Sequence, residues 1–447
     1  MIDRKIYIET LGCAKNIVDS ERVAYLFSKN GAIIIQDPEE ADFVLVNTCG
    51  FIDESKQESI EYILSYSKLK EELKKKGKEQ KLIVFGCLAE RYKEELLREI
   101  PEIDFISGVK DYLSLLGILS RSNLKILDTS SEYRDIVFSE REFSRFVNRE
   151  YPYAYVKISE GCNHTCSFCA IPLIRGKQRS RTIESLVEEV KFLADNGIRE
   201  VILVSQDTSS YGIDIYGKPK LPKLLYEISK ISGIEWIRLH YLYPTEVSEE
   251  LIDTIAGIDK VCKYVDMPLQ HASNKILRSM KRGGTKENYI ELINRIKERI
   301  KDVALRTTFI VGYPGETRED FKELLDFVKE ISFTWVGVFT YSHEEGTSAY
   351  SLEDNVPKNI KSRRRNELLR LQQKVTEENL RRLVGKVKKV IVDEVLDDHN
   401  YIARTEYNSP EVDGSVHLVS SRKLRKGDFT DVFVSKVVGY DLYGKAI

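Results

Sequence analysis

The sequence lacks a surplus of positive charge. Its 447 residues contain 69 Lys and Arg against 71 Asp and Glu, a formal net charge of -2. A protein that binds nucleic acid over its whole surface would carry a basic excess, so this class is excluded, although a local basic patch is not. The sequence also lacks an uncharged run of membrane-spanning length and a signal-peptide layout at its start. We therefore expect a cytoplasmic protein without a membrane partner.

Seven cysteines are present despite this reducing compartment. There they are better explained by metal binding or by chemistry than by disulfides. Cys162, Cys166 and Cys169 form a C-x3-C-x2-C run in a short polar loop that follows an expected strand. A soft, all-sulfur ligand set favours zinc or an iron–sulfur cluster. Three thiolates instead of four would leave one iron of a cluster open to another ligand.

A structural zinc site is the alternative for this loop. It would need His164 or a distant side chain as its fourth ligand. Structural zinc sites favour two separated pairs of ligands, a spacing that this run does not have. We therefore favour the cluster and expect His164 to face solvent.

The first part of the chain predicts a small parallel sheet of the doubly wound type, because strands and helices alternate there. The expected strands are residues 5–10, 42–47 and 81–85, and the expected helices are residues 20–29, 53–76 and 88–100. Cys13, Cys49 and Cys87 each follow one of these strands and each adjoin a glycine. Since parallel strands end at one edge of a sheet, where ligands bind, we expect the three thiols to meet there. The alternative is three buried structural cysteines, which are common in cores.

The middle of the chain predicts an incomplete barrel of the (β/α)6 type. The expected strands are residues 153–159, 200–206, 236–242, 264–270, 303–312 and 334–342. Active sites of barrels lie at the carboxyl ends of the strands. The polar residues expected there are Gln206, Asp207, Tyr241, Gln270, His271, Ser342, His343 and Glu344. Gln206 and Gln270 are candidates for hydrogen bonds to a cofactor or substrate. The register of Arg306 is open, and Cys262 is expected to be a buried structural cysteine.

The end of the chain predicts a helix followed by a small all-β barrel. The helix is expected over 357–383, and we interpret its arginines 363–365 as a solvated face rather than a nucleic-acid site. The tail, 385–447, has short β-rich runs with turns at 398–400 and 413–414. The predicted domains are 1–140, 150–384 and 385–447, with a charged linker over 141–150.

These motifs together resemble one family. The run Cys162–Cys169, with Phe168 before its last cysteine, is similar to the signature of radical S-adenosylmethionine (SAM) enzymes, in which SAM chelates the open iron. The whole chain resembles the radical SAM methylthiotransferases, which have an N-terminal three-cysteine domain, a radical SAM barrel and a C-terminal five-stranded TRAM barrel. The resemblance implies SAM and two 4Fe–4S clusters as cofactors.

The resemblance also implies the residues that bind these cofactors. One cluster is expected on Cys13, Cys49 and Cys87, and the other on the catalytic set Cys162, Cys166 and Cys169. The segment 311–317, with Gly312 and Gly315, is similar to one near the adenine and ribose of SAM. Its alternative is a simple strand-to-helix turn with Thr317 as N-cap.

Two branches of the family differ in substrate. One modifies an adenosine in tRNA and usually opens with a WGCQMN-like motif; the other modifies an aspartate of small-subunit ribosomal protein S-twelve and tends to open with LGCPKN-VDSE. Residues 11–21 read LGCAKNIVDSE, with Ala14 where proline is usual, and are similar to the second branch. The tail, 385–447, has ten Lys and Arg and ten Asp and Glu. A neutral tail favours a protein partner, because phosphate neutralisation dominates nucleic-acid affinity. The acidic residues that could face such a basic protein are Asp393, Glu394, Asp397, Asp398 and Asp413.

The resemblance implies methylthiolation of the β-carbon of that aspartate. No acid–base pair removes hydrogen from such a carbon, so the cofactors must supply radical chemistry. A flavodoxin- or ferredoxin-like reductant is implied as a further partner, and no direct binding of nucleic acid is expected. One alternative is a tRNA adenosine methylthiotransferase. The other is a non-catalytic iron–sulfur electron carrier or RNA-binding factor, which would not cleave SAM.

Overall fold

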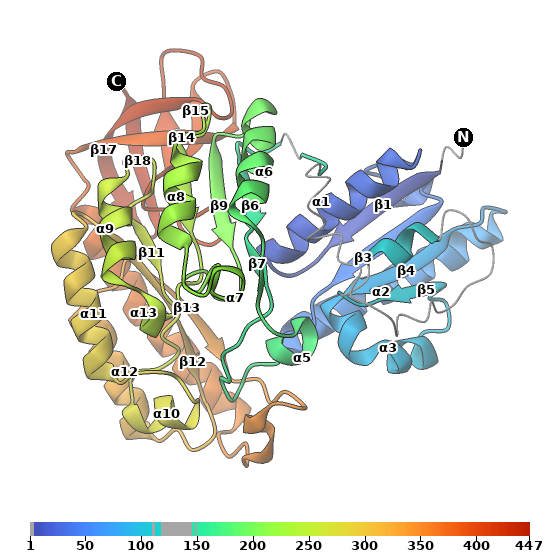
Figure 1. The fold of residues 1–447 in the computed structure, drawn as a ribbon, viewed down its shortest axis with the longest axis horizontal. Coiled ribbons are helices and arrows are strands. Elements are labelled where there is room, and N and C mark those ends of the chain that lie inside the picture. Colours follow the sequence, from blue (N-terminus) through green and yellow to red (C-terminus); the bar gives the residue numbers. More distant parts are fainter. Residues whose placement is uncertain (1–3, 110–111, 118–144, 148–149) are drawn as a thin grey trace. The chain divides into compact units, whose positions relative to one another are not determined.

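The structure is a computed structural model that describes residues 4–109, 112–117, 145–147 and 150–447. The chain divides into two compact units (Figure 1). The first unit takes residues 1–148, 160–164 and 169–181, and the second takes 149–159, 165–168 and 182–447. Most of the predicted linker, 141–144 and 148–149, lies outside the described residues. The predicted domain boundaries stay predictions.

A five-stranded parallel sheet forms the first unit, in the order β2-β1-β3-β4-β5. Its strands are β1 (Lys5–Thr10), β2 (Ile33–Ile34), β3 (Phe43–Thr48), β4 (Lys81–Gly86) and β5 (Phe105–Ser107). Its helices are α1 (Ala14–Lys29), α2 (Asp53–Lys75), α3 (Cys87–Glu99) and α5 (Ile171–Arg175), with 3-10 turns η1 (Pro38–Glu40) and η2 (Tyr112–Leu116) and the short strand β8 (Arg179–Ser180). The prediction of a doubly wound sheet is confirmed. The predicted start of the first helix at residue 20 was wrong, since α1 begins directly after Cys13.

Both faces of this sheet are covered by helices (Figure 1). Leu45 and Phe85 point to one face, where they pack with α1. Val44 and Val84 point to the other, where they pack with α2 and α3. Residues 43–46 of β3 and 82–85 of β4 are therefore apolar in succession rather than at alternate positions, as is usual for buried parallel strands.

Six parallel strands of the second unit form a partial barrel. They make two three-stranded sheets, β10-β9-β6 and β11-β12-β13, joined by one parallel bridge between Ile237 and Val261. The strands are β6 (Tyr153–Lys157), β9 (Glu200–Val204), β10 (Trp236–Leu239), β11 (Tyr264–Asp266), β12 (Ala304–Val311) and β13 (Trp335–Thr340), and the chain leaves β6 through β7 (Ser159–Glu160). The helices are α6 (Ile183–Asp195), α7 (Ile213–Tyr216), α8 (Leu221–Ser229), α9 (Glu249–Gly257), α10 (Asn274–Ser279), α11 (Lys286–Arg299) and α12 (Arg318–Ile331), with 3-10 turns η4 (Pro244–Glu246) and η5 (Ser348–Ser351). The partial barrel was predicted with these six strands.

Helix α13 (Lys358–Arg381) leads into a closed five-stranded barrel of order β14-β15-β16-β18-β17. The strands are β14 (Val387–Val395), β15 (Asn400–Thr405), β16 (Val416–Val419), β17 (Phe429–Val438) and β18 (Asp441–Ala446). The small barrel predicted for the tail is confirmed. The solvated face predicted for arginines 363–365 is wrong at Arg364, whose buried guanidinium binds Glu316 at 2.7 Å.

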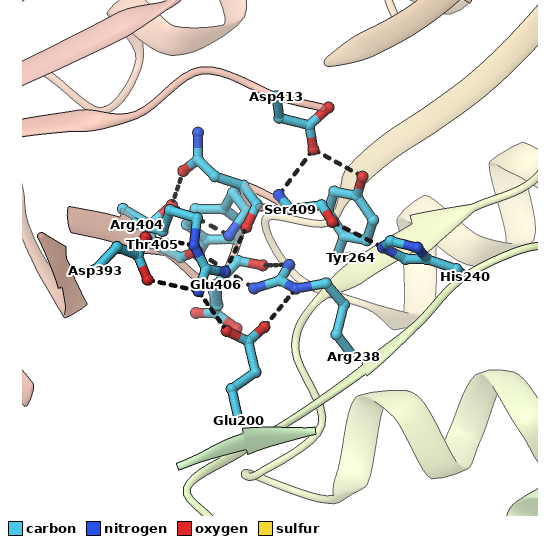
Figure 2. Close-up of polar contacts among 12 residues, drawn as sticks. Glu200, Arg238, His240, Tyr264, Asp393, Arg404, Thr405, Glu406, Ser409 and Asp413 are labelled. Carbon is cyan, nitrogen blue, oxygen red and sulfur yellow. Dashed lines mark hydrogen bonds and ion pairs between the residues drawn. The ribbon is translucent and has the colours of Figure 1, made fainter. Parts of the chain in front are cut away.

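A buried ionic network joins the small barrel to the partial barrel (Figure 2). Glu200, at the start of β9, accepts a hydrogen bond from Arg238 at 2.7 Å and forms an ion pair with Arg404 at 2.8 Å. Arg404 also binds Asp393 at 2.6 Å, and Arg238 donates to the carbonyl of Glu406 at 2.7 Å. Burial would raise the pKa of Glu200, but the two guanidinium groups outweigh it and hold that pKa below its usual value.

The loop between β15 and β16 enters the same network (Figure 2). Its Asp413 accepts hydrogen bonds from the Tyr264 hydroxyl at 2.7 Å and the Ser409 amide at 2.8 Å. Ser409 in turn lies 2.8 Å from Nε2 of His240. Arg306, whose direction the sequence left open, lies 3.5 Å from Asp413. Asp393 and Asp413 are thus engaged inside the protein, and the expectation that these two carboxylates face a basic partner is wrong.

Replacing Glu200 by Gln should therefore destabilise the second unit strongly. The substitution leaves Arg238 and Arg404 buried without their shared carboxylate, and breaking a buried ion pair costs about 3–5 kcal/mol. The free energy of unfolding in urea measures the loss.

The matched control is Glu227→Gln, which breaks the exposed pair with Lys230. It should change the free energy of unfolding by less than about 1 kcal/mol. Equal, small effects of the two substitutions would show that the buried network does not hold the small barrel in place.

Candidate functional site

Three cysteines lie at the carboxyl edge of the first unit's sheet. Cys13 follows β1, Cys49 follows β3 and Cys87 follows β4. The chain order reverses between β1 and β3, because β2 pairs with the other side of β1, and ligands of open α/β sheets bind at such a switch point. Cys13 is the N-cap of α1 and Cys87 is the first residue of α3. A helix N-terminus favours a thiolate.

Two glycines bring these cysteine loops into contact. Gly12 has φ +91°, and a Cβ there would lie only 2.7 Å from the Cβ of Cys49 and 3.0 Å from its Sγ. A Cβ on Gly50 would lie 2.8 Å from the backbone of Leu88 and 3.0 Å from that of Cys87. The three loops therefore pack with no room for a methyl group between them.

The donor set suits an iron–sulfur cluster, because its ligands are three thiols at one sheet edge. All seven cysteines are thiols. Within the described part of the chain, no three His, Cys, Asp or Glu side chains converge closely enough to hold one metal ion. Cysteines that bind a cluster each take a different iron, so they stand farther apart than the ligands of one ion. Three thiols on glycine-rich loops at one sheet edge suit such a group.

The motif LGCAKNIVDSE also fixes the loops through polar side chains. The Asn16 amide donates to the carbonyls of Leu11 at 2.8 Å and Thr48 at 3.2 Å, which ties the end of β1 to the end of β3. The Asn47 amide donates to the Ser20 hydroxyl at 2.9 Å, which ties β3 to α1. The sequence identified this motif but not these roles.

Arg175, at the end of α5, is buried beside the same edge. It binds Asp19 at 3.2 Å and Glu160 at 2.8 Å. It also donates to Asn16 Oδ1 at 2.8 Å and to Cys87 Sγ at 3.1 Å. Sequence reasoning missed this residue, although it lies only six positions after Cys169.

The three thiols have different pKa values. Burial would raise the pKa of Cys13, but Lys15 and Arg175 outweigh it, so this pKa lies below its usual value. Burial and the neighbouring Cys13 raise the pKa of Cys49. Burial raises the pKa of Cys87 to about 12, and Arg175 opposes it only in part. Metal binding here must release protons, because thiolates are the ligands.

The C-x3-C-x2-C run is shared between the two units, with Cys162 and Cys169 in the first and Cys166 in the second. In the first, the Cys162 amide donates to the Gly176 carbonyl at 3.1 Å, and a Cβ on Gly161 would lie 2.2 Å from the Lys177 carbonyl. In the second, Phe168 packs against a core that contains α10 residues. His164 is half-buried, so its predicted exposure is only partial.

Arg282 holds Cys166 in the second unit. Its Nη1 donates to Cys166 Sγ at 3.3 Å and its Nη2 to the Pro268 carbonyl at 2.6 Å. The guanidinium lies over the ring of Tyr243, 4.1 Å from the centroid. Sequence reasoning gave no signal for this residue.

The predicted rim residues follow their strands, and two of them have unusual backbones. Tyr241, beyond β10, has φ 62°, and Gln270, beyond β11, has φ 75°. The Gln270 backbone pairs with Thr308 and Ile310 on β12, each at 2.8 Å. Left-handed non-glycine residues are strained and gather at functional sites. Contact of Gln206 or Gln270 with SAM stays a prediction.

The segment 311–317 is stabilised by hydrogen bonds to the Glu316 carboxylate and by the N-cap of α12. The Gly312 amide donates to the Glu316 carboxylate at 2.5 Å, and Arg364 binds the same carboxylate. Thr317 is the N-cap of α12 in a capping box. Gly315 has φ +78° with nothing within 4 Å of its Cβ position, while its amide donates to Asn355 at 2.9 Å and its carbonyl accepts from Lys275 at 2.8 Å. These contacts support the strand-to-helix turn at Gly312, while SAM contacts at both glycines stay predictions.

The remaining candidates have structural partners. His271 accepts a hydrogen bond at Nδ1 from the Ser273 amide at 2.9 Å, and its Nε2 lies 3.7 Å from Glu316. Cys262 is buried in the apolar core that joins the partial barrel to the small one, as predicted. None of the described helices combines the length and the apolarity that crossing a membrane requires.

Family models match all three parts of the chain. The Radical SAM superfamily matches residues 156–328, the uncharacterized protein family UPF0004 matches 5–108, and the TRAM domain matches 384–447. The fold and the site thus define a radical SAM enzyme with a TRAM barrel.

Relatives cover the whole chain. "Ribosomal protein uS12 methylthiotransferase RimO" of Clostridioides difficile (strain 630) is 44% identical over 443 residues, which is 99% of both chains. The protein of the same name from Aquifex aeolicus (strain VF5) is 46% identical over 99% of this chain and 97% of its own. The chain belongs to the radical SAM methylthiotransferases, within the family of these RimO proteins. Membership confirms the predicted class of enzyme and the predicted cofactors, SAM and two 4Fe–4S clusters.

Solved structures support the fold alone. The radical SAM methyltransferase TsrM from Kitasatospora setae, solved with cobalamin and a 4Fe–4S cluster, has a TM-score of 0.57 at 16% identity, covering 76% of this chain and 75% of its own. The cobalamin-dependent radical enzyme OxsB has a TM-score of 0.54 at 13% identity, covering 83% and 56%.

Replacing Gly12 by Ala should disrupt the cysteine edge. Alanine would have to adopt the left-handed backbone of Gly12, which costs about 1–2 kcal/mol. Its Cβ would also clash with Cys49, and such overpacking costs about 1–3 kcal/mol more. Urea unfolding and the iron content after anaerobic reconstitution measure the two effects.

Gly77→Ala is the control, because Gly77 has φ +81° and nothing within 4 Å of its Cβ position. It should show only the backbone penalty and full iron content. If both variants lose the same stability and keep their iron, the close packing of the cysteine loops does not matter for the site.

Proposed function

We propose that this enzyme transfers a methylthio group to the β-carbon of an aspartate in ribosomal protein S-twelve. The observation that carries this proposal is the identity of 44–46% over 99% of the chain to proteins named for that reaction. The opening motif LGCAKNIVDSE agrees with it, because this motif resembles that of the branch that acts on S-twelve. The reaction belongs in the cytoplasm, where ribosomal proteins are found.

We assign each cluster to one set of three cysteines. Cys13, Cys49 and Cys87 would hold one, since their loops share a sheet edge, and the catalytic run Cys162, Cys166 and Cys169 would hold the other. Bound SAM and the clusters supply the radical and the sulfur. The chain itself supplies the glycines that let the loops close, and the carbonyls and amides that hold them. Gln206, Gln270, Gly312 and Gly315 are our candidates for SAM contacts.

The partners follow from charge. The neutral TRAM tail gives no basic surplus for tRNA phosphates, which supports a protein substrate and no direct binding of nucleic acid. Glu394, Asp397 and Asp398 are exposed and remain candidates for facing the basic substrate. A flavodoxin- or ferredoxin-like protein would deliver the electrons.

The first test offers both substrates to the reconstituted enzyme. Clusters are rebuilt anaerobically, the protein is reduced with SAM present, and S-twelve and bulk tRNA are supplied in one tube. Mass spectrometry should find a methylthio gain on one aspartate of S-twelve and none on tRNA adenosine. A gain on tRNA would show that the motif and the tail charge do not indicate the substrate. If SAM is not cleaved at all, the proposal that the protein is a radical SAM enzyme would be contradicted.

A second test separates the cysteine sets. The triple variant Cys13→Ala, Cys49→Ala, Cys87→Ala should keep about half of the iron and still cleave SAM, because only one cluster is lost. It should form no methylthio product. Cys262→Ala is the control and should keep full iron and activity. Full iron in the triple variant would refute the assignment of these three ligands.

A further inference from the structure

Each set of three cysteines has one arginine on one of its sulfurs, and the first of these arginines is buried while the second is half-buried. Arg175 lies 3.1 Å from Cys87 Sγ in the first unit, and Arg282 lies 3.3 Å from Cys166 Sγ in the second. The two arginines come from unrelated elements, one from helix α5 and the other from the turn after α10. The arrangement therefore arises twice on separate scaffolds.

Arg175 is oriented by several partners at once. Its side chain is 1% exposed, and its Nη1 lies between the carboxylates of Asp19 and Glu160. Asp19 is further held by the Tyr112 hydroxyl at 3.1 Å. These bonds occupy Nη1 and aim Nη2 at Asn16 and at Cys87. Arg175 could pair with Asp19 and Glu160 without also contacting the Cys87 sulfur, so these two carboxylates do not by themselves account for that contact.

Arg282 is half-buried and has no carboxylate partner among the described residues, so no ion pair within the fold explains its position. Its contacts include the Cys166 sulfur, the Pro268 carbonyl and the Tyr243 ring. Its Nε is buried without any hydrogen-bond partner among the described residues. A guanidinium keeps its charge at every physiological pH, and a charge that is partly removed from water is stabilised by a compensating one nearby. The Cys166 sulfur, as a thiolate ligand, is the anion placed to compensate it.

We propose that Arg175 and Arg282 set the reduction potentials of the two clusters, each through one hydrogen bond to a ligand sulfur. The inference rests on the proposed assignment of the six cysteines. Reduction adds negative charge to a cluster and its sulfurs, and hydrogen bonds to those sulfurs tune the potential. A guanidinium N–H stabilises the reduced form more than the oxidised form, so each arginine raises the potential of its own cluster. Both act as positioning residues through the cysteine that they hold.

Redox titration of both clusters in single variants of the full-length enzyme tests this. Arg175→Gln should lower the potential of the N-terminal cluster, and Arg282→Gln that of the SAM-binding cluster. At the wild-type midpoint, the ratio of reduced to oxidised cluster should fall about tenfold, which is about 59 mV for a one-electron couple. The other cluster should not shift, so each variant is the control for the other. EPR follows the two clusters separately, with the triple cysteine-to-alanine variant identifying the signal of the SAM-binding cluster.

Two further variants separate a specific role from a structural one. Arg145 is equally buried and ion-paired with Glu21 in the first unit, so Arg145→Gln should leave both potentials unchanged. If a glutamine variant does not fold, Arg175→Lys or Arg282→Lys decides, because lysine keeps the charge but loses the planar fork. Each lysine variant should fold, bind its cluster and still lower its potential.

The outcomes are distinct. A shift confined to the cluster beside the mutated arginine supports the proposal. Unshifted potentials, equal shifts of both clusters, or a folded variant that no longer binds its cluster would overturn it. Wild-type enzyme that binds fewer than two clusters would instead overturn the assignment of the cysteines, on which the inference rests.

Discussion

Parallel strands end together at one edge of their sheet, and both compact units depend on this constraint. In the first unit it brings residues from three separate loops, each following its own strand, to a single switch point. In the second it gathers polar residues beyond β9, β10 and β11 at one rim. Cofactors that need ligands from distant parts of a chain can be served by such an edge without long loops, because the sheet itself aligns the strand ends.

Glycines allow the cysteine loops to approach one another closely, and buried polar side chains hold the loops in place. Because Gly12 and Gly50 have no Cβ, the loops can touch at these positions. The Asn16 amide donates to the carbonyls of Leu11 and Thr48, which the strand ends leave without a partner in the sheet. A site built this way is rigid before the cofactor arrives, and such preorganisation matters because a reactive group must be held near its productive geometry. Burial raises the pKa of Cys87 and would raise that of Cys13, but Lys15 and Arg175 outweigh it at Cys13, so their positive charge is part of the site.

The sequence could predict the frame and the ligands but not the side chains that support them. Strand β1 was predicted to the residue, and all six strands of the partial barrel were found, because apolar runs bounded by polar turns mark buried parallel strands. The strands β2 and β5 were missed because two or three residues carry no period. Arg175 and Arg282 could not be recognised, since a charged residue reads as exposed until its partners, up to 159 positions away, are known. The same reason explains the errors at Arg364 and Asp413, whose charges are paired inside the protein.

The small barrel is packed firmly against the partial barrel and is not a loosely tethered domain. Glu200 and Arg238 of the strands and Arg404 of the small barrel share one buried network, and the apolar core around it runs through Trp236 and Tyr401 without a break. Separating the two barrels would expose the apolar core and leave buried charges without their partners. The free-energy cost of this separation would exceed the free energy that binding a substrate at a surface provides. The small barrel therefore cannot swing to deliver a substrate. Any substrate that it contacts must meet a surface fixed relative to the strands, so the distance from that surface to the carboxyl ends of the strands is set by the fold.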